Sequence, residues 1–264
     1  MTVGIIGAGV MGETLLAGLL RSGMPTQELL IAERRADRAA ELADKYGVTV
    51  VDNGTAASRA DTLILLVKPQ DMPGVLAEIS QTLRPGALVI SIAAGITTEY
   101  LEGLLPAGTH VVRVMPNTPA LVDQAMSAIS PGSTCNAEHL ETAETLMRSV
   151  GKVIQLPEKY QDAVTAISGS GPAYIYYVTE AMIEAGVMLG MPRDVSTQMV
   201  YQTVFGAASM LMETQLHPTV LREQVTSPGG TTVAALRVFD DFKVRAAFLS
   251  AMEAARDRSI ELGK

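Results

Sequence analysis

A glycine-rich turn near the start of the chain constrains its fold more than any other feature. An apolar run, VGII at 3–6, leads directly into a GxGxxG sequence, and a helical pattern follows. In a strand–turn–helix unit the first glycine permits a tight turn, the second lets the backbone approach a pyrophosphate, and the third lets helix and strand pack closely. GxGxxG alone is a weak signal, but this order of elements is the one that dinucleotide binding requires. The six predicted contact residues are Gly7, Ala8, Gly9, Val10, Met11 and Gly12.

The rest of the N-terminal half repeats the alternation of strand and helix. Further short apolar runs lie between helical patterns, at 29–32, 48–51, 62–67, 87–92 and 110–115. Continuous apolar runs suit the strands of a parallel sheet that is covered on both faces. Two more runs, at 126–130 and 152–156, predict two further edge strands. The repetition predicts an α/β Rossmann domain over residues 1–156, with a doubly wound, mostly parallel sheet.

The C-terminal half has a different pattern, with no strand signal after Pro157. Residues 172–190, 194–214 and 234–262 each predict a long helix, and the first two are apolar on nearly all faces. A helix that is apolar all round must be buried. About a hundred residues cannot easily cover such helices alone, so we expect two copies of the chain to interleave. Burial against the chain's own sheet domain is the alternative. We predict an all-α dimerisation domain over residues 157–264.

Charge and composition narrow the classes of partner and the compartment. The formal net charge of −8 disfavours nucleic acid and anionic membranes as partners. Cys135 is the only cysteine, which precludes a disulfide within the chain and fits a reducing compartment. The N-terminus lacks a signal-peptide pattern, and the longest uncharged runs contain Ser, Thr and Gln throughout. We expect a cytoplasmic protein without membrane segments.

The end of the second predicted strand bears on the choice of cofactor. It reads Glu33-Arg34-Arg35. An acidic residue there can accept a hydrogen bond from a free ribose 2′-hydroxyl, which favours NAD, whereas arginine can bind a 2′-phosphate, which favours NADP. Arg34, Arg35 and Arg38 together favour NADP(H), with NAD(H) as the alternative cofactor.

Other residues at the carboxyl ends of strands are further candidates, because ligands bind at that edge of a doubly wound sheet. Asn53 follows the third run, and Val67-Lys68-Pro69 follows the fourth. The stretches 93–95 and 115–119 follow the fifth and sixth runs. Lys68 is a cation at the end of an apolar strand, so we expect it near the cofactor.

A second glycine-containing stretch, VTSPGGTT at 225–232, has two interpretations. Glycines let backbone N–H groups approach an anion closely, and a helix N-terminus favours an anion through its dipole and unpaired donors. Ser227, Thr231 or Thr232 could instead serve as a plain helix N-cap. The residues alone leave both interpretations open.

Taken together, these stretches resemble the pyrroline-5-carboxylate reductase family over nearly the whole chain. The matching motifs are GAGVMG, VKP, SIAAGI, VVRVMPNTPA, DAVTAISGSGPAY and HPTVLREQVTSPGGTT. The resemblance implies reduction of 1-pyrroline-5-carboxylate to L-proline with NAD(P)H, the last step of proline biosynthesis. It also implies a Rossmann domain followed by a helical dimerisation domain, in homodimers that often build up into decamers.

The resemblance further implies roles for individual residues. The turn at 7–12 would hold the pyrophosphate, Arg34 would lie near the adenosine ribose, and Ala94 would approach the nicotinamide. The remaining cofactor residues that it implies are Asn53, Val67, Lys68 and Pro69. The substrate-binding residues that it implies are Glu158, Ser227, Gly229, Gly230, Thr231 and Thr232. Among these, Thr232 is the catalytic candidate, through a hydrogen bond to the imine nitrogen. Glu33 beside Arg34 departs from the family pattern.

The chemistry of a cyclic imine agrees with the residues present. A protonated imine is already electrophilic, so the reaction needs no metal, and the sequence offers no H-E-x-x-H or cysteine–histidine cluster. A β-hydroxyacid dehydrogenase is the enzymatic alternative, but that family places an acid–base lysine on the first long helix of its second domain. Residues 171–190 contain no lysine. A non-catalytic NADP-binding regulator is the second alternative, since a fold does not fix a function.

Overall fold

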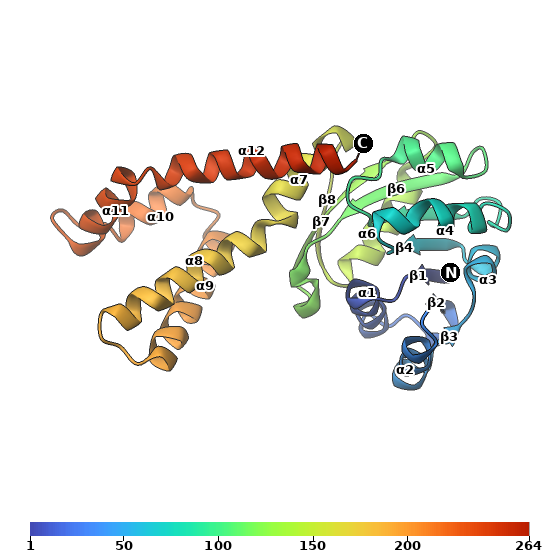
Figure 1. Cartoon of the computed structure of the whole chain (residues 1–264), viewed down its shortest axis with the longest axis horizontal. Coiled ribbons are helices and arrows are strands. Elements are labelled where there is room, and N and C mark those ends of the chain that lie inside the picture. The colour runs from blue at the N-terminus through green and yellow to red at the C-terminus, as the bar shows by residue number, and fades with distance from the viewer. Residues whose placement is uncertain (264) are drawn as a thin grey trace. The chain divides into compact units, whose positions relative to one another are not determined.

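The computed structural model describes residues 1–263, which divide into two compact units (Figure 1). One unit comprises Met1–Ser170 together with the C-terminal residues from Ala255, and the other comprises Gly171–Ala254. The first is an α/β unit and the second is entirely helical, so the predicted combination of a Rossmann domain and an all-α domain is confirmed. Among the described residues, no helix is long and apolar enough to cross a membrane.

An eight-stranded sheet forms the centre of the α/β unit. Its strands are β1 (Val3–Ile6), β2 (Leu29–Ala32), β3 (Thr49–Val50), β4 (Thr62–Leu65), β5 (Leu88–Ser91), β6 (His110–Met115), β7 (Ala125–Pro131) and β8 (Gly151–Gln155). They lie in the order β3-β2-β1-β4-β5-β6-β7-β8, and every pair is parallel except β6 and β7. The first six strands have the order of dinucleotide-binding folds, in which the ligand crosses the sheet edge between β1 and β4.

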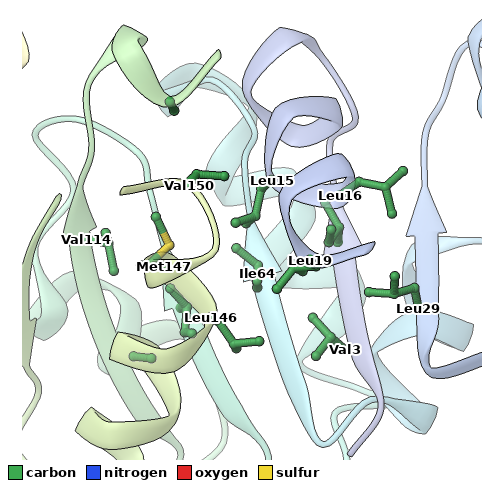
Figure 2. Close-up of a cluster of buried hydrophobic side chains, with 14 of the residues drawn as sticks. Val3, Leu15, Leu16, Leu19, Leu29, Ile64, Val114, Leu146, Met147 and Val150 are labelled. Carbon is green, nitrogen blue, oxygen red and sulfur yellow. The ribbon is translucent and has the colours of Figure 1, made fainter. Parts of the chain in front are cut away.

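Helices cover both faces of this sheet. They are α1 (Val10–Arg21), α2 (Ala36–Tyr46), α3 (Asn53–Arg59), α4 (Met72–Ile79), α5 (Thr98–Leu104), α6 (Ala137–Arg148) and the short α7 (Gln161–Val164). Leu15, Leu16 and Leu19 of α1 pack with Leu146 and Met147 of α6 in one buried cluster (Figure 2). A second cluster joins α3, α4 and α5 to other strand residues, including Ile6, Leu63 and Leu65. Because successive strand side chains point to opposite faces, continuous apolar strands supply both clusters.

Short turns of tighter or wider helix connect these elements. They are η1 (Thr26–Glu28), η2 (Pro69–Asp71), η3 (Thr118–Val122), η4 (Glu158–Tyr160) and η5 (Thr165–Gly169), the last a π-helix.

The helical unit contains α8 (Gly171–Met188), α9 (Arg193–Thr214), α10 (Pro218–Gln224), α11 (Thr231–Asp241) and the first part of α12 (Val244–Leu262). Ser196 Oγ at the start of α9 donates to the Ile183 carbonyl of α8 at 2.9 Å. Many large apolar side chains on both helices are exposed in the single chain, including Tyr177 (76%), Met188 (81%) and Phe205 (67%).

Two elements differ from those predicted from the sequence. The strand predicted at 126–130 is not at the edge, because β7 pairs with β6 on one side and β8 on the other. The short η3 connection turns the chain back beside β6, which makes β7 antiparallel and leaves only β8 at that edge. The helix predicted over 234–262 is two helices. Lys243 has a left-handed backbone, with φ of 55°, and separates α11 from α12.

Candidate active site

The glycine-rich turn lies between β1 and α1, and two of its glycines, Gly7 and Gly12, are required by the structure for different reasons. Gly7 has φ of +91°, and a Cβ there would lie 2.7 Å from the Leu66 carbonyl oxygen. A Cβ on Gly12 would collide with the Gly7 carbonyl oxygen, so this glycine sets how closely α1 approaches the turn. Gly9 is exposed and has open space where its Cβ would be. The turn therefore leaves an open backbone surface beside the N-terminus of α1, where phosphate groups can be bound.

The Ala8 peptide in this turn is held from both sides by charged side chains. Its N–H donates to Glu33 Oε2 at 3.1 Å, and its carbonyl accepts from Arg38 Nε at 3.4 Å. Arg38 is only 14% exposed, and Glu13 and Glu41 both bind its guanidinium. Arg38 is therefore a support of the turn rather than a free cation.

Glu13, in the first turn of α1, is the anion that holds this support in place. Its carboxylate accepts hydrogen bonds from Lys45 Nζ and from Tyr46 Oη, each at 2.8 Å, besides its ion pair with Arg38. The hydrogen bonds from Lys45, and then from Arg38 and Tyr46, lower the pKa of Glu13 to about 2, although burial opposes the shift. The network ties both ends of α2 to α1 and to the turn.

A cavity of about 440 Å³ lies at the carboxyl ends of β1, β2 and β4. Its size is in the general range of small-molecule and cofactor pockets. It brings together six of the predicted cofactor residues, namely Gly7, Gly9, Arg34, Asn53, Val67 and Lys68. Six other predicted residues do not line it, namely Ala8, Val10, Met11, Gly12, Pro69 and Ala94. The glycine cradle and the two cations at this edge fit a dinucleotide.

The polar and charged side chains that line the cavity differ in their partners and in their exposure. Arg34 is 77% exposed, and its Nη2 lies 3.5 Å from Asp71 Oδ1 across the cavity. Asn53 Nδ2 donates to Glu78 at 2.6 Å. Lys68 is exposed. Sequence reasoning missed Asp71 as a cavity residue, although it follows the VKP motif by only two positions and η2 turns it back toward β2.

Two other predicted residues of the α/β unit lie near the ends of β5 and β8. Ala94 is exposed in the connection that follows β5. Glu158 accepts from Thr98 N at 2.8 Å, from Thr98 Oγ1 at 2.6 Å and from the buried Arg113 at 3.1 Å. Its side chain is 25% exposed. Glu158 therefore joins the start of α5 to β6 and the segment after β8.

The stretch 225–232 forms a turn that leads into α11, in the helical unit. Gly229 has φ of +69°, and the Gly230 N–H donates to the Ser227 carbonyl at 3.0 Å. Gly230 is the N-cap residue of α11, and among residues 1–263 no side chain caps this helix. The three predicted cap candidates, Ser227, Thr231 and Thr232, therefore do not cap it. The first-turn N–H groups of α11 are therefore without a side-chain partner, and Thr232 lies half-buried among them.

The histidines and the cysteine have structural contacts. His110 and His139 stack with ring centroids 3.8 Å apart, and the His217 side chain accepts from Thr219 N at 3.2 Å at the start of α10. Cys135 Sγ donates to the Val111 carbonyl, and burial raises the pKa of this thiol. Within residues 1–263 no group of three or more His, Cys, Asp or Glu side chains could hold a metal ion.

Two family models match the chain. Residues 158–262 match the model described as pyrroline-5-carboxylate reductase dimerisation, and residues 2–95 match the model described as NADP oxidoreductase, coenzyme F420-dependent. The α/β unit is thus of the nicotinamide-cofactor-binding type, and the helical part carries a homo-oligomerisation domain.

Relatives and solved structures match from end to end. The chain is 45% identical to pyrroline-5-carboxylate reductase of Corynebacterium melassecola, over 100% of this chain and 99% of the relative. The corresponding values for Methanosarcina acetivorans are 43%, 99% and 98%. The structure of a pyrroline-5-carboxylate reductase from Coxiella burnetii has a TM-score of 0.94 at 36% identity, covering 100% and 98% of the two chains. The Plasmodium falciparum pyrroline carboxylate reductase with NADP bound has a TM-score of 0.90 at 28% identity, covering 100% and 98%. The chain belongs to the pyrroline-5-carboxylate reductase family.

Proposed function

We propose that this chain reduces the C=N bond of 1-pyrroline-5-carboxylate to give L-proline, using a nicotinamide cofactor, as the last step of proline biosynthesis. The observation that carries this proposal is the full-length match with curated pyrroline-5-carboxylate reductases, at up to 45% identity. That match covers 100% of this chain, and so it spans both the glycine-rich turn at 7–12 and the turn at 227–232. A β-hydroxyacid dehydrogenase would need an acid–base lysine, which α8 lacks.

In the proposed reaction the cofactor supplies the hydride, and the α/β unit binds the cofactor. When bound, the nicotinamide ring of NAD(P)H supplies the hydride that reduces the imine carbon. The open backbone of the 7–12 turn and the N-terminus of α1 would bind the pyrophosphate through their N–H groups. Lys68, Val67 and Asn53 would line the adenosine half, and Ala94 would face the nicotinamide.

We propose NADP(H) as the preferred cofactor. Arg34 is the exposed guanidinium in the cavity, and a guanidinium can bind a 2′-phosphate with two parallel hydrogen bonds. Arg35 and Arg38 support this preference less, because they contact Glu33 and Glu13 respectively.

The turn before α11 would bind the substrate. An uncapped helix N-terminus favours a carboxylate, and Gly229 with the first-turn residues of α11 would supply the N–H donors. Since the Gly230 N–H is already bonded to Ser227, we assign Gly230 a role in shaping the turn. The Thr232 hydroxyl would donate to or accept from the imine nitrogen as that nitrogen changes its charge. Glu158 is the remaining substrate-binding residue that we propose. Thr98 and Arg113 would fix the position of its carboxylate, which accepts hydrogen bonds from both.

We propose that two copies associate through residues 157–264. Tyr177, Met188 and Phe205 are exposed apolar side chains on α8 and α9. An open groove of about 800 Å³ is lined by Met199, Tyr201 and Phe205, which would suit a helix of a second copy. Further assembly into a decamer stays a prediction from the resemblance.

An assay of NADPH consumption tests the activity. The consumption should depend on added 1-pyrroline-5-carboxylate, and L-proline should be identified as the product. The same assay with NADH tests the cofactor preference. A protein that binds NADPH but never consumes it with this substrate would instead support the non-catalytic regulator.

A further inference from the structure

The cavity at the end of β2 contains two carboxylates, one bound by backbone donors of the protein and the other facing Arg34. In a dinucleotide-binding fold the acidic residue at the end of β2 is the usual acceptor for the ribose 2′-hydroxyl, and Glu33 has that position. Its Oε2 accepts from Ala8 N at 3.1 Å, and its Oε1 accepts from Arg35 N at 3.0 Å. The side chain is only 11% exposed. Both oxygens of Glu33 are therefore directed at backbone donors of the protein.

Asp71 presents the opposite situation. It lies in the connection between β4 and α4, where its N–H donates to the Lys68 carbonyl at 2.9 Å. Asp71 is the N-cap residue of α4, yet its side chain makes no capping hydrogen bond. The carboxylate instead faces Arg34, with Oδ1 3.5 Å from Nη2, and both side chains line the same cavity.

We propose that Asp71 is a specificity-determining residue that sets the balance between NADPH and NADH, while Glu33 positions the glycine-rich turn. The proposal rests on the proposed nicotinamide cofactor site. A 2′-phosphate would have to take Arg34 from Asp71 and would then lie beside a second anion, which weakens NADPH binding. A free 2′-hydroxyl can donate to Asp71 without that repulsion, which strengthens NADH binding. Asp71 therefore moderates the preference that Arg34 creates.

The test is equilibrium binding of NADPH and of NADH to the full-length protein, measured by calorimetry without substrate. Asp71→Asn keeps the size of the side chain and removes its charge. We expect NADPH to bind roughly fivefold more tightly, because repulsion between the 2′-phosphate and the partly exposed Asp71 carboxylate is removed. NADH should bind roughly tenfold more weakly, because a hydrogen bond to a charged acceptor is lost.

Glu33→Gln is the matched control, with the same change of charge in the same cavity. It should weaken both nucleotides by the same factor, because the side chain supports the turn and does not contact the ribose. Asp71→Ala, with a melting curve for each variant, separates a binding effect from a folding defect.

Unchanged affinities in Asp71→Asn, or equal losses for both nucleotides, would overturn the proposal. So would a selective loss of NADH in Glu33→Gln. Wild-type protein that binds both nucleotides but does not reduce 1-pyrroline-5-carboxylate would refute the proposed activity while leaving the binding ratios to decide about Asp71. Wild-type protein that binds neither nucleotide would overturn both.

Discussion

At the scale of single residues, the Thr232 hydroxyl is the group that the proposed reaction depends on most directly. It lies half-buried in the first turn of α11, a helix that no side chain caps. Thr232→Val keeps the shape and removes the hydroxyl. The hydrogen bond lost is one to the imine nitrogen, whose charge changes during the reaction. Its loss costs about 1.5–3 kcal/mol of transition-state stabilisation, so kcat/KM for 1-pyrroline-5-carboxylate should fall roughly ten- to a hundredfold. Steady-state kinetics measure this loss, with NADPH affinity and Tm nearly unchanged.

Thr219→Val on α10 is a control for the same chemical change in the same unit. The backbone N–H of Thr219 donates a hydrogen bond to His217, and the substitution preserves this bond because it changes only the side chain. Its kinetics should match the wild type. A Thr232→Val protein with near-normal kcat/KM and a lowered Tm would show that Thr232 has a structural role only.

Glu13 gives the stability of the α/β unit a dependence on acid. Its pKa in the folded protein is lowered from 4.5 to about 2, first by the hydrogen bond from Lys45. A carboxyl with a depressed folded pKa contributes stability above its unfolded pKa, and that contribution is lost as the pH falls toward the folded value. Glu13→Gln should therefore unfold more easily than the wild type at pH 7. The difference should shrink between about pH 4.5 and pH 2. Urea titrations across this range measure it, and a difference independent of pH would contradict the assignment.

At the scale of elements, the glycine-rich turn offers two substitutions of the same size, of which one should weaken cofactor binding and the other should lower stability. Gly9 has a conformation that alanine can adopt, with φ of −65° and ψ of −165°, and open space around its Cβ position. Gly9→Ala should fold normally and bind NADPH roughly tenfold or more weakly, because the methyl group occupies the approach to the pyrophosphate. Gly12→Ala should lose roughly 1–3 kcal/mol of stability, because its Cβ collides with the Gly7 carbonyl.

Thermal unfolding and nucleotide titration of both variants check this pair. If Gly9→Ala bound NADPH as tightly as the wild type, the turn would not contact the pyrophosphate.

The elements themselves were largely predictable, because continuous apolar runs and glycine turns are local signals. β1, β2 and β6 have the bounds that the sequence predicts. The position of β7 inside the sheet was not predictable, since pairing with both β6 and β8 is a long-range property. The break at Lys243 was missed for another reason. Lysine is a poor signal for a left-handed backbone, which glycine usually supplies.

The cavity was predictable in outline and less so in its contacts. Motifs at the carboxyl ends of β1, β2 and β4 indicated where it lies, since those ends share one edge of the sheet. The sequence does not show which charges bind one another. Glu33 contacts Ala8 and Arg38 contacts Glu13, and both pairs are separated by 25 positions in the chain. Such pairings leave Arg34 and Asp71 as the charges that face each other across the cavity.

At the scale of the whole molecule, the exposed apolar side chains of α8 and α9 are the feature that most needs a partner. Large contiguous apolar surfaces on a folded chain mark an interaction site, and residues 158–262 match a dimerisation model. Obligate interfaces of this kind bury more than about 2,000 Å². We therefore expect light scattering to give at least twice the mass of one chain at micromolar concentration, and no monomer.

Phe205→Glu tests whether that dimer forms through the helical unit. Phe205 is 67% exposed and lines the open groove on α9. Burying the phenyl ring is worth about 1.5–3 kcal/mol, and a dimer with two-fold symmetry buries it twice. Replacing it with a carboxylate removes this gain and adds the cost of burying a charge, so the variant should become monomeric. Leu121→Glu is the control, because Leu121 is also an exposed apolar residue, at 58%, but lies on η3 of the α/β unit. It should remain dimeric. A wild-type monomer that reduces 1-pyrroline-5-carboxylate at full rate would refute the interleaved dimer, and a dimeric Phe205→Glu protein would place the interface elsewhere.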